Sequence, residues 1–283
     1  MNAIDLEAAD VYCRLLARRH YENFAVASRL VHRSVRRDLV RVYAFCRTTD
    51  DLGDESSSKD AALSRLQRWR DETVAVFAGT APVHPVLVAL SETIERSELP
   101  AQPFLDLIAA NVMDQNVSSY AAWPDLEAYC RLSAAPVGRM VLCVFGIGDP
   151  AARRLSDDVC IGLQLANHAQ DVKRDAAIGR SYLPESEIAE RGVAGAVRSI
   201  VERARGLLAS GCELEAKVRA PLRVQLALYR LGGLAICDAI EQIGFRTDRE
   251  RPHLSRATKF TLAARALLPP VRRTGGMRSA ENR

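Results

Sequence analysis

Polar side chains recur at a fixed interval along residues 161–184, IGLQLANHAQDVKRDAAIGRSYLP. Asn167, Asp171 and Asp175 stand four residues apart. This spacing places them on one face of a helix, about 6 Å between neighbours, and Gln164 joins that face one turn earlier. The flanking residues are apolar, which indicates a buried segment, and buried carboxylates are costly unless they are paired or bind a metal ion.

A second segment, RVYAFCRTTDDLGDE at residues 41–55, repeats the pattern with Asp50 and Asp54. Asp51 lies off their common face, where a solvated position is the alternative to metal binding. Mg²⁺ prefers oxygen ligands and neutralises the charge of a leaving diphosphate. Two acidic faces opposed across a helical cavity would therefore form a site for Mg²⁺ and a diphosphate. One such pair alone would as readily be a solvated helix face, but two favour metal binding over structural ion pairs.

Basic groups lie where they could complete such a site. Arg47 precedes Asp50 by one turn, and Arg180 and Tyr182 follow the second acidic segment. Once the diphosphate leaves, a carbocation remains, and apolar and aromatic walls would exclude water from it. For single residues the ordinary interpretation is packing or capping, and it applies to His20, Phe24, Phe45, Tyr129 and His168.

Helical periodicity dominates the chain, and no alternation typical of strands competes with it. We expect one all-α domain over residues 1–268, a single helical bundle around a central cavity, followed by a disordered basic tail at 269–283. Gly53 is expected to break the second helix, and Pro124 to begin a long helix reaching about residue 145. The predicted helices cover residues 5–20, 34–51, 60–78, 85–96, 103–119, 124–145, 151–176, 193–218, 221–243 and 255–267.

Charge is unevenly distributed in this 283-residue chain of formal net charge +4. Residues 246–283 hold ten Lys or Arg against three Asp or Glu, which suits an anionic lipid surface or a diphosphate. For the last ten residues a solvated surface is an equal alternative. No nucleic-acid motif accompanies the charge, so nucleic acid is not an expected partner. Peripheral membrane contact is predicted through this region and its apolar residues Phe260, Leu262, Leu267 and Leu268.

Cellular location is predicted from three negative signals. The seven cysteines show no metal-binding spacing and are typical of reduced core residues. Acidic residues at positions 5, 7 and 10 argue against a signal peptide, and no apolar run approaches the ~20 residues of a spanning helix. We expect a cytoplasmic protein that contacts the inner face of the membrane.

Together these segments resemble the squalene/phytoene synthase family, over about residues 8–265. The resemblance implies an isoprenoid-synthase fold, a prenyl diphosphate substrate and Mg²⁺ as cofactor. It implies a metal site whose ligands and catalytic carboxylates are Asp50, Asp54, Asp171 and Asp175, with Asp51 and Asn167 as further ligands. HYENF matches a phosphate-contacting segment. The implied diphosphate contacts are then His20, Asn23, Arg47, Arg180 and Tyr182, and the implied cavity residues are Phe24, Phe45, Tyr129 and Gln164.

Three further stretches resemble the hydroxysqualene-forming branch of this family: HYENFAVAS, GTAPVHPVLVAL and YCRLSAAPVGRM. This likeness implies that presqualene diphosphate and water become hydroxysqualene and diphosphate, without a reductant. It also implies an upstream presqualene diphosphate synthase and a downstream oxidoreductase as pathway partners. Ala135 and the pair His168–Ala169 depart from the expected residues, which puts substrate length and the fate of the cation in doubt.

Other functions fit part of the pattern. A head-to-head condensing synthase, making presqualene diphosphate, squalene or phytoene from farnesyl or geranylgeranyl diphosphate, would need the same metal site. A non-enzymatic helical scaffold would be expected to lose its aspartates, which are intact here. A di-iron bundle needs two Glu-x-x-His motifs, and the one candidate, Glu250 to His253, contains Pro252.

Overall fold

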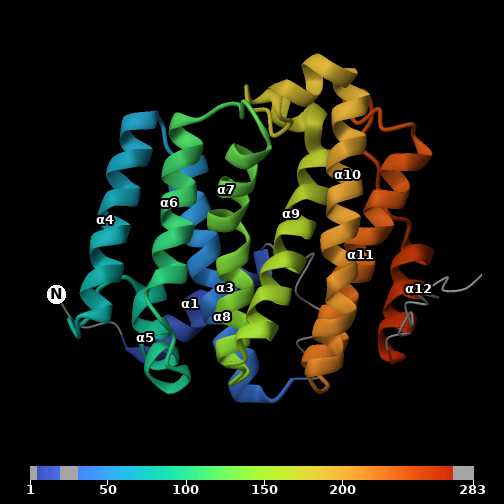
Figure 1. Cartoon of the computed structure of the whole chain (residues 1–283). Helices are drawn as coiled ribbons and strands as arrows, with labels where there is room; N and C mark the ends of the chain where they lie inside the picture. The colour runs from blue at the N-terminus through green and yellow to red at the C-terminus, as the bar shows by residue number, and fades with distance from the viewer. Residues whose placement is uncertain (1–4, 20–30, 270–283) are drawn as a thin grey trace, which may run out of the picture.

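The computed structural model describes residues 5–19 and 31–269, and these residues form a bundle of long helices (Figure 1). Within them there is no β-strand, only an isolated bridge between Tyr120 and Pro184. The all-α prediction is confirmed. In order, the helices are α1 (Leu6–Arg19), α3 (Arg33–Asp54), α4 (Lys59–Phe77), α5 (Pro85–Ser97), α6 (Gln102–Asn116), α7 (Trp123–Ser133), α8 (Ala135–Val144), α9 (Pro150–Ala177), α10 (Glu185–Lys217), α11 (Leu222–Gln242) and α12 (Arg256–Leu267).

The first acidic segment remains helical to its last carboxylate. The expected break at Gly53 is wrong, because α3 continues through Gly53 to Asp54. Gly53 is buried, and a Cβ there would lie 3.0 Å from Oδ1 of Asn111 and 3.3 Å from Nε2 of Gln115. The glycine therefore lets α6 approach α3 closely beside the acidic residues.

One other expectation fails at a proline, and a glycine divides a later helix. The long helix predicted from Pro124 is instead α7 and α8, separated at Ala134. Pro136, in the first turn of α8, has no N–H to donate, which favours a helix start over a helix interior. Helix α10 is kinked at the non-helical Gly192, whose φ is 67°, so its long second part begins at residue 193 as predicted. The short first part, from Glu185 to the kink, was not predicted.

The core around α9 fixes the second acidic segment. Helix α9 packs against α10 through a buried cluster that includes Leu165, Ala169, Val197 and Leu208. A Cβ on Gly162 would lie 3.0 Å from Leu208, so this glycine permits the close approach of the two helices. One face of α9 is therefore held in the core, while its last turns carry the polar residues.

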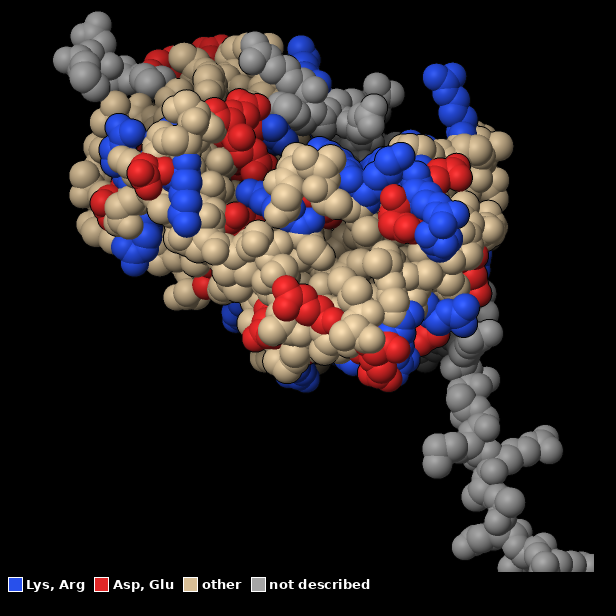
Figure 2. All heavy atoms as spheres, turned by 90° about the horizontal axis from the view of Figure 1, so that it is seen from above, with Lys and Arg blue, Asp and Glu red and all other residues tan. Residues whose placement is uncertain are grey.

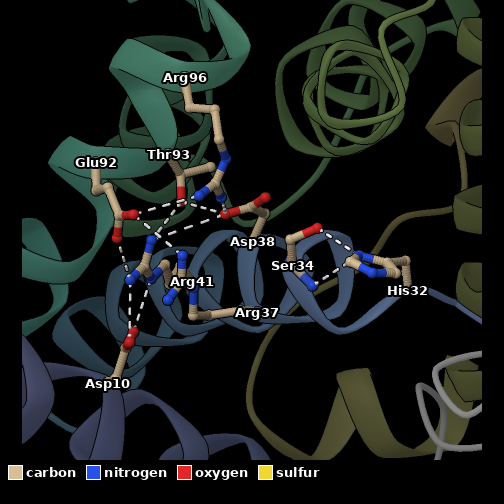
Figure 3. Close-up of polar contacts among 9 residues, drawn as sticks. All are labelled: Asp10, His32, Ser34, Arg37, Asp38, Arg41, Glu92, Thr93 and Arg96. Carbon is tan, nitrogen blue, oxygen red and sulfur yellow. Dashed lines mark hydrogen bonds and ion pairs between the residues drawn. The ribbon is translucent and has the colours of Figure 1, made fainter.

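Helix α3 is anchored at its other end by buried charges (Figure 3). Arg41 has no exposed surface and pairs with Asp10 of α1 at 2.7 Å and with Glu92 of α5 at 2.7 Å. Asp38 accepts a hydrogen bond from Thr93 at 2.8 Å and pairs with Arg96. This network joins α1, α3 and α5, and it fixes the direction in which α3 runs toward its acidic end.

Other predictions meet the structure as follows. All seven cysteines are free, as expected. None of the described helices has the length and apolar character needed to cross a membrane. The predicted disordered tail lies outside the described residues, apart from Pro269.

Candidate active site

The acidic end of α3 faces α6. Nδ2 of Asn111 donates a hydrogen bond to Oδ1 of Asp50 at 3.2 Å. The Asp50 side chain is accessible to solvent, but desolvation by neighbouring protein atoms still raises its pKa to about 6. The charge of Asp54 adds to this rise, and the hydrogen bond from Asn111 opposes it. Asp51 points elsewhere and pairs with Arg47. Asp50 is thus the carboxylate of this segment that lacks a compensating cation.

The acidic end of α9 has one paired and one poorly paired carboxylate. Asp171 pairs with Arg251, from the segment between α11 and α12, and more distantly with Arg174 at 3.7 Å. Desolvation and the charge of Asp171 raise the pKa of Asp175 to about 6. Asn167, one turn earlier, is exposed.

Arg180 joins the two acidic segments. Its backbone N–H donates to the carbonyl of Asp175 at 2.9 Å. Its guanidinium pairs with Asp54 at 3.4 Å and donates to the backbone carbonyl of Asp114 at 3.4 Å. Because one residue contacts the ends of α3, α6 and α9, the acidic segments predicted from the sequence belong to one site.

Asp114 of α6 lies at the centre of a polar cluster beside this arginine. Tyr129 donates a hydrogen bond to its Oδ2 at 2.7 Å, and Tyr182 donates to its Oδ1 at 3.0 Å. Burial raises the pKa of Asp114, although both hydrogen bonds and the charge of Arg180 oppose the rise. Tyr182, predicted to contact a diphosphate, is here a partner of Asp114.

Aromatic rings continue the site into the interior. His168 stacks on Tyr182 with ring centroids 3.9 Å apart, and Tyr129 lies 5.5 Å from Tyr182. Gln164 lies within hydrogen-bond distance of His168, 3.2 Å between their Nε2 atoms. Burial lowers the pKa of His168 to about 3, so its ring is neutral. His168 packs, as expected for a residue off the acidic face.

Some predicted site residues are placed elsewhere. Phe45 is fully buried, stacked on Trp69 at 5.2 Å and edge-on to Phe104 at 4.9 Å, so its ring presents no exposed surface to a ligand. The remaining predicted contacts, His20, Asn23 and Phe24, lie outside the described residues.

No metal-binding geometry is formed in the part of the chain that the structure describes: no three His, Cys, Asp or Glu side chains are close enough to hold an ion. Three of the acidic groups, Asp51, Asp54 and Asp171, instead pair with arginines. A separate hollow of about 1090 Å³ lies between α1 and the first turns of α3. It contains none of the predicted site residues, so the chemistry of the side chains, rather than hollow size, locates the candidate site.

The sequence prediction missed four residues of the candidate site. Asn111 and Asp114 stand three apart on α6, and Gln115 follows, so NVMDQN carries the same helical spacing that identified the other segments. Arg251 carried no such signal, because its pairing with Asp171 depends on how the segment after α11 folds back against α9.

Both acidic segments reach the same end of the bundle, at the top of Figure 1. Figure 2, which looks down on that end, shows acidic and basic side chains gathered next to each other near the middle of the face. The site thus combines oxygen donors, arginines and an adjoining aromatic interior.

Comparison with known proteins identifies the relatives of this arrangement. A family model described as squalene/phytoene synthase matches residues 17–258. The chain belongs to the squalene/phytoene synthase family. Phytoene synthase from Arthrospira platensis is 29% identical over 273 residues, 86% of this chain and 87% of the relative. Presqualene diphosphate synthase from Rhodopseudomonas palustris is 33% identical over 174 residues, covering 60% of this chain and 61% of that protein.

Solved structures of this family share the fold. The crystal structure of squalene synthase HpnC from Alicyclobacillus acidocaldarius has a TM-score of 0.80 and 43% identity, covering 85% of this chain and 95% of that chain. A dehydrosqualene synthase in complex with a ligand has a TM-score of 0.81 at 21% identity, covering 93% and 96%. The expected isoprenoid-synthase fold is confirmed, and the chain is an enzyme of the prenyl synthase type.

Proposed function

We propose that this synthase converts presqualene diphosphate and water to hydroxysqualene and diphosphate, with Mg²⁺ as cofactor, in squalene and hopanoid biosynthesis. The observation that carries the proposal is the position of Arg180. Its contacts with Asp54, Asp175 and Asp114 bring two Asp-rich segments and a cation together. A diphosphate with bound Mg²⁺ needs both kinds of group.

The donor set fits Mg²⁺. The charges of Asp50 and Asp175 are not fully compensated by the protein, as their raised pKa values near 6 indicate, and a divalent cation would provide that compensation. The residues proposed to hold the metal are Asp50, Asp51, Asp54, Asn167, Asp171 and Asp175, all oxygen donors. When bound, Mg²⁺ neutralises the charge that develops on a leaving diphosphate.

The arginines and aromatic residues have separate tasks in this proposal. Arg180 and Arg47 orient the diphosphate, and Nε–H of Arg47 is a buried donor without an acceptor among the described residues. The substrate C–O bond breaks heterolytically, and its electron pair leaves with the diphosphate. The rings of Tyr129, Tyr182 and the neutral His168 limit water access to the cation. One water then forms the new C–O bond and releases a proton.

Similarity to known proteins supports the squalene and hopanoid branch of the family over phytoene formation. The squalene synthase structure shares 43% of its aligned residues with this chain, against about 29–33% for phytoene and presqualene diphosphate synthases. The second candidate is head-to-head condensation of farnesyl or geranylgeranyl diphosphate. The phytoene and presqualene diphosphate synthases among the relatives favour this candidate. Condensation would use the same acidic segments.

Product analysis distinguishes the two candidates. Purified protein with Mg²⁺ receives presqualene diphosphate or farnesyl diphosphate, each with and without NADPH, and products are identified by mass spectrometry. We expect a hydroxylated C30 alcohol from presqualene diphosphate alone, in equal amount with and without NADPH. Consumption of farnesyl diphosphate would establish condensation. Release of no diphosphate from presqualene diphosphate would reject the proposal.

The proposed reaction also places the protein among partners. Its substrate requires an upstream enzyme that condenses two prenyl diphosphates, and its hydroxylated product requires a downstream oxidoreductase to become a hydrocarbon. We propose a cytoplasmic location with peripheral contact at the inner face of the membrane, since both substrate and product carry long apolar chains.

A further inference from the structure

Helix α12 lies at the edge of the bundle and carries unusually exposed apolar side chains (Figure 1). Phe260 is 78% exposed, Leu267 61% and Leu268 64%. Phe260 and Leu267 are seven residues apart, so they lie on one face of the helix, with the exposed Ala264 between them. The opposite face packs on α11, where Ala266 is buried and Leu262 partly buried.

Charge accompanies this apolar face. Helix α12 contains Arg256, Lys259 and Arg265, all exposed, and no acidic residue. The sequence that follows, residues 270–283, adds four arginines and one glutamate. A short helix with exposed apolar side chains and only positive charges is complementary to an anionic lipid surface.

Backbone groups at both ends of α12 are capped by hydrogen bonds with side chains. The Ser255 side chain accepts a hydrogen bond from the Thr258 N–H at 3.0 Å. Arg223 of α11 donates to the terminal carbonyls of Leu268 at 2.8 Å, Leu267 at 3.0 Å and Ala266 at 3.4 Å. Helix ends otherwise need water for these groups, and water is scarce between lipid headgroups and acyl chains. The Arg223 clamp thus suits a helix whose C-terminus is partly withdrawn from water.

A second copy of the chain is a poorer occupant of this face. A 12-residue helix is about 18 Å long and ~10 Å wide, so one face offers roughly 200 Å². A stable protein interface needs about 800 Å² per partner. The residues after Pro270 are a poor cover as well, because Val271 and Met277 are their only large apolar residues.

We propose that α12 is the membrane-contacting element of this enzyme, with Phe260, Leu267 and Leu268 inserted among the headgroups of an anionic bilayer and Arg256, Lys259 and Arg265 facing lipid phosphates. The inference rests on the exposed surface of α12 and holds whichever prenyl diphosphate the active site uses. It refines the peripheral contact predicted from the sequence, which named the whole basic C-terminal region together with Phe260, Leu262, Leu267 and Leu268. Leu262 is now assigned to packing against α11.

Vesicle flotation tests this assignment in the full-length protein without Mg²⁺ or substrate. Vesicles of phosphatidylcholine with 30% phosphatidylglycerol are compared with vesicles of phosphatidylcholine alone, at low salt. We expect wild-type protein to float with the anionic vesicles. The triple variant F260S/L267S/L268S should bind at least tenfold more weakly. Each of R256Q, K259Q and R265Q should weaken binding by about fivefold.

Matched controls separate α12 from other exposed surfaces. Val83 and Val74 are 56% and 41% exposed on a different part of the bundle, and V83S/V74S should bind as wild type does. Replacing Arg272, Arg273, Arg278 and Arg283 by glutamine tests the last residues alone. The proposal is overturned if wild type does not float, if the triple variant floats normally, or if only the last-residue variant loses binding. A wild-type dimer that the triple variant abolishes, seen by light scattering, would also overturn it.

Enzyme turnover, measured as diphosphate release from presqualene diphosphate in detergent micelles, is a readout independent of membrane binding. The α12 variants should retain wild-type turnover there, because none of the substituted residues lies in the candidate active site. Loss of flotation with full turnover supports the membrane assignment, whereas absent turnover in wild type with normal flotation would reject only the proposed reaction.

Discussion

The two ends of α3 hold charged side chains in opposite ways. At the first end, Arg41 is fully buried and pairs with Asp10 and Glu92 (Figure 3). Burial acts to raise the pKa of Glu92, but the hydrogen bond and charge of Arg41 lower it below its ordinary value. At the other end, Asp50 has an amide as its hydrogen-bond partner, and its pKa is raised to about 6.

This difference separates structural carboxylates from the proposed metal-binding carboxylates in one helix. Acids whose charge is fully compensated by arginines stabilise the fold and have little need of a ligand. A carboxylate whose negative charge is only partly balanced, in a partly desolvated position, has an unfavourable ionised form until a cation binds. The comparison therefore predicts that substitutions at the two ends of α3 will affect stability and turnover in opposite proportions.

The largest effect should follow removal of the carboxylates proposed to hold the metal ion. Alanine at Asp50, Asp54, Asp171 or Asp175 should each lower turnover by about 10³-fold, because each is proposed to hold the metal that neutralises the diphosphate. Circular dichroism should show an unchanged helical fold. Steady-state diphosphate release is the measurement.

An exposed acid outside the site serves as control for this series. Asp71 of α4 lies on the surface, where it accepts a hydrogen bond from Gln67. D71A should keep turnover within about twofold of wild type. Near-normal turnover in any of the four site variants would remove that residue from the proposed metal set.

Substitution at the Arg41 end of α3 should instead lower the stability of the fold. Arg41→Met retains volume but leaves Asp10, Asp38 and Glu92 without their shared cation. Breaking a buried ion pair from one side costs about 3 kcal/mol, so chemical denaturation should show a loss of that order in the free energy of unfolding. Folded R41M at low temperature should still release diphosphate at a rate close to wild type. A variant as stable as wild type would show that the network contributes little to the fold.

The contrast between the ends of α3 was only partly visible in the sequence. Fixed helical spacing predicted the helices and placed Asp171 and Asp175 on one face, because both depend on neighbours within one turn. The partners that decide compensation lie far along the chain. Arg251 is 80 residues from Asp171, and Asn111 is 61 from Asp50. Gly53 failed as a helix breaker because its propensity was outweighed by close packing against α6.

Acidification should weaken metal binding at the candidate active site. Asp50 and Asp175 have raised pKa values near 6, so each is ionised above that pH and protonated below it. A metal ion requires the ionised form, and its affinity should be full above about pH 7 and fall about tenfold per pH unit below 6 for each carboxyl that must lose a proton. Mn²⁺ used as a paramagnetic probe gives this affinity directly.

Substituting one carboxyl sharpens the pH test. In Asp50→Asn the Mn²⁺ affinity should be lower at every pH, and its slope below pH 6 should decrease by one proton. Affinity that stays constant between pH 5 and 7 would contradict the assignment of these two carboxylates as ligands.

The smallest effect concerns stability without metal, and its sign is the informative part. The folded pKa of Asp50, about 6, exceeds the ordinary 3.8 expected in the unfolded chain. The stability from its protonated form is therefore full below pH 3.8 and lost as pH rises through 6. At pH 7 Asp50→Asn removes an unfavourable charge and should raise the free energy of unfolding by about 1 kcal/mol, a value reduced for solvent access to the side chain.

Asp38→Asn is the matched substitution at the compensated end, and it should have the opposite sign. Asp38 is buried, accepts a hydrogen bond from Thr93 and pairs with Arg96, so the neutral amide loses a favourable charge interaction. Denaturant titration of both variants at pH 7 in the presence of a chelator compares them directly. If D50N were destabilised as D38N is, Asp50 would be a structural acid, and the two ends of α3 would not differ in kind. A more stable but inactive D50N would show that the fold tolerates an unfavourable charge at the position where the reaction requires a carboxylate.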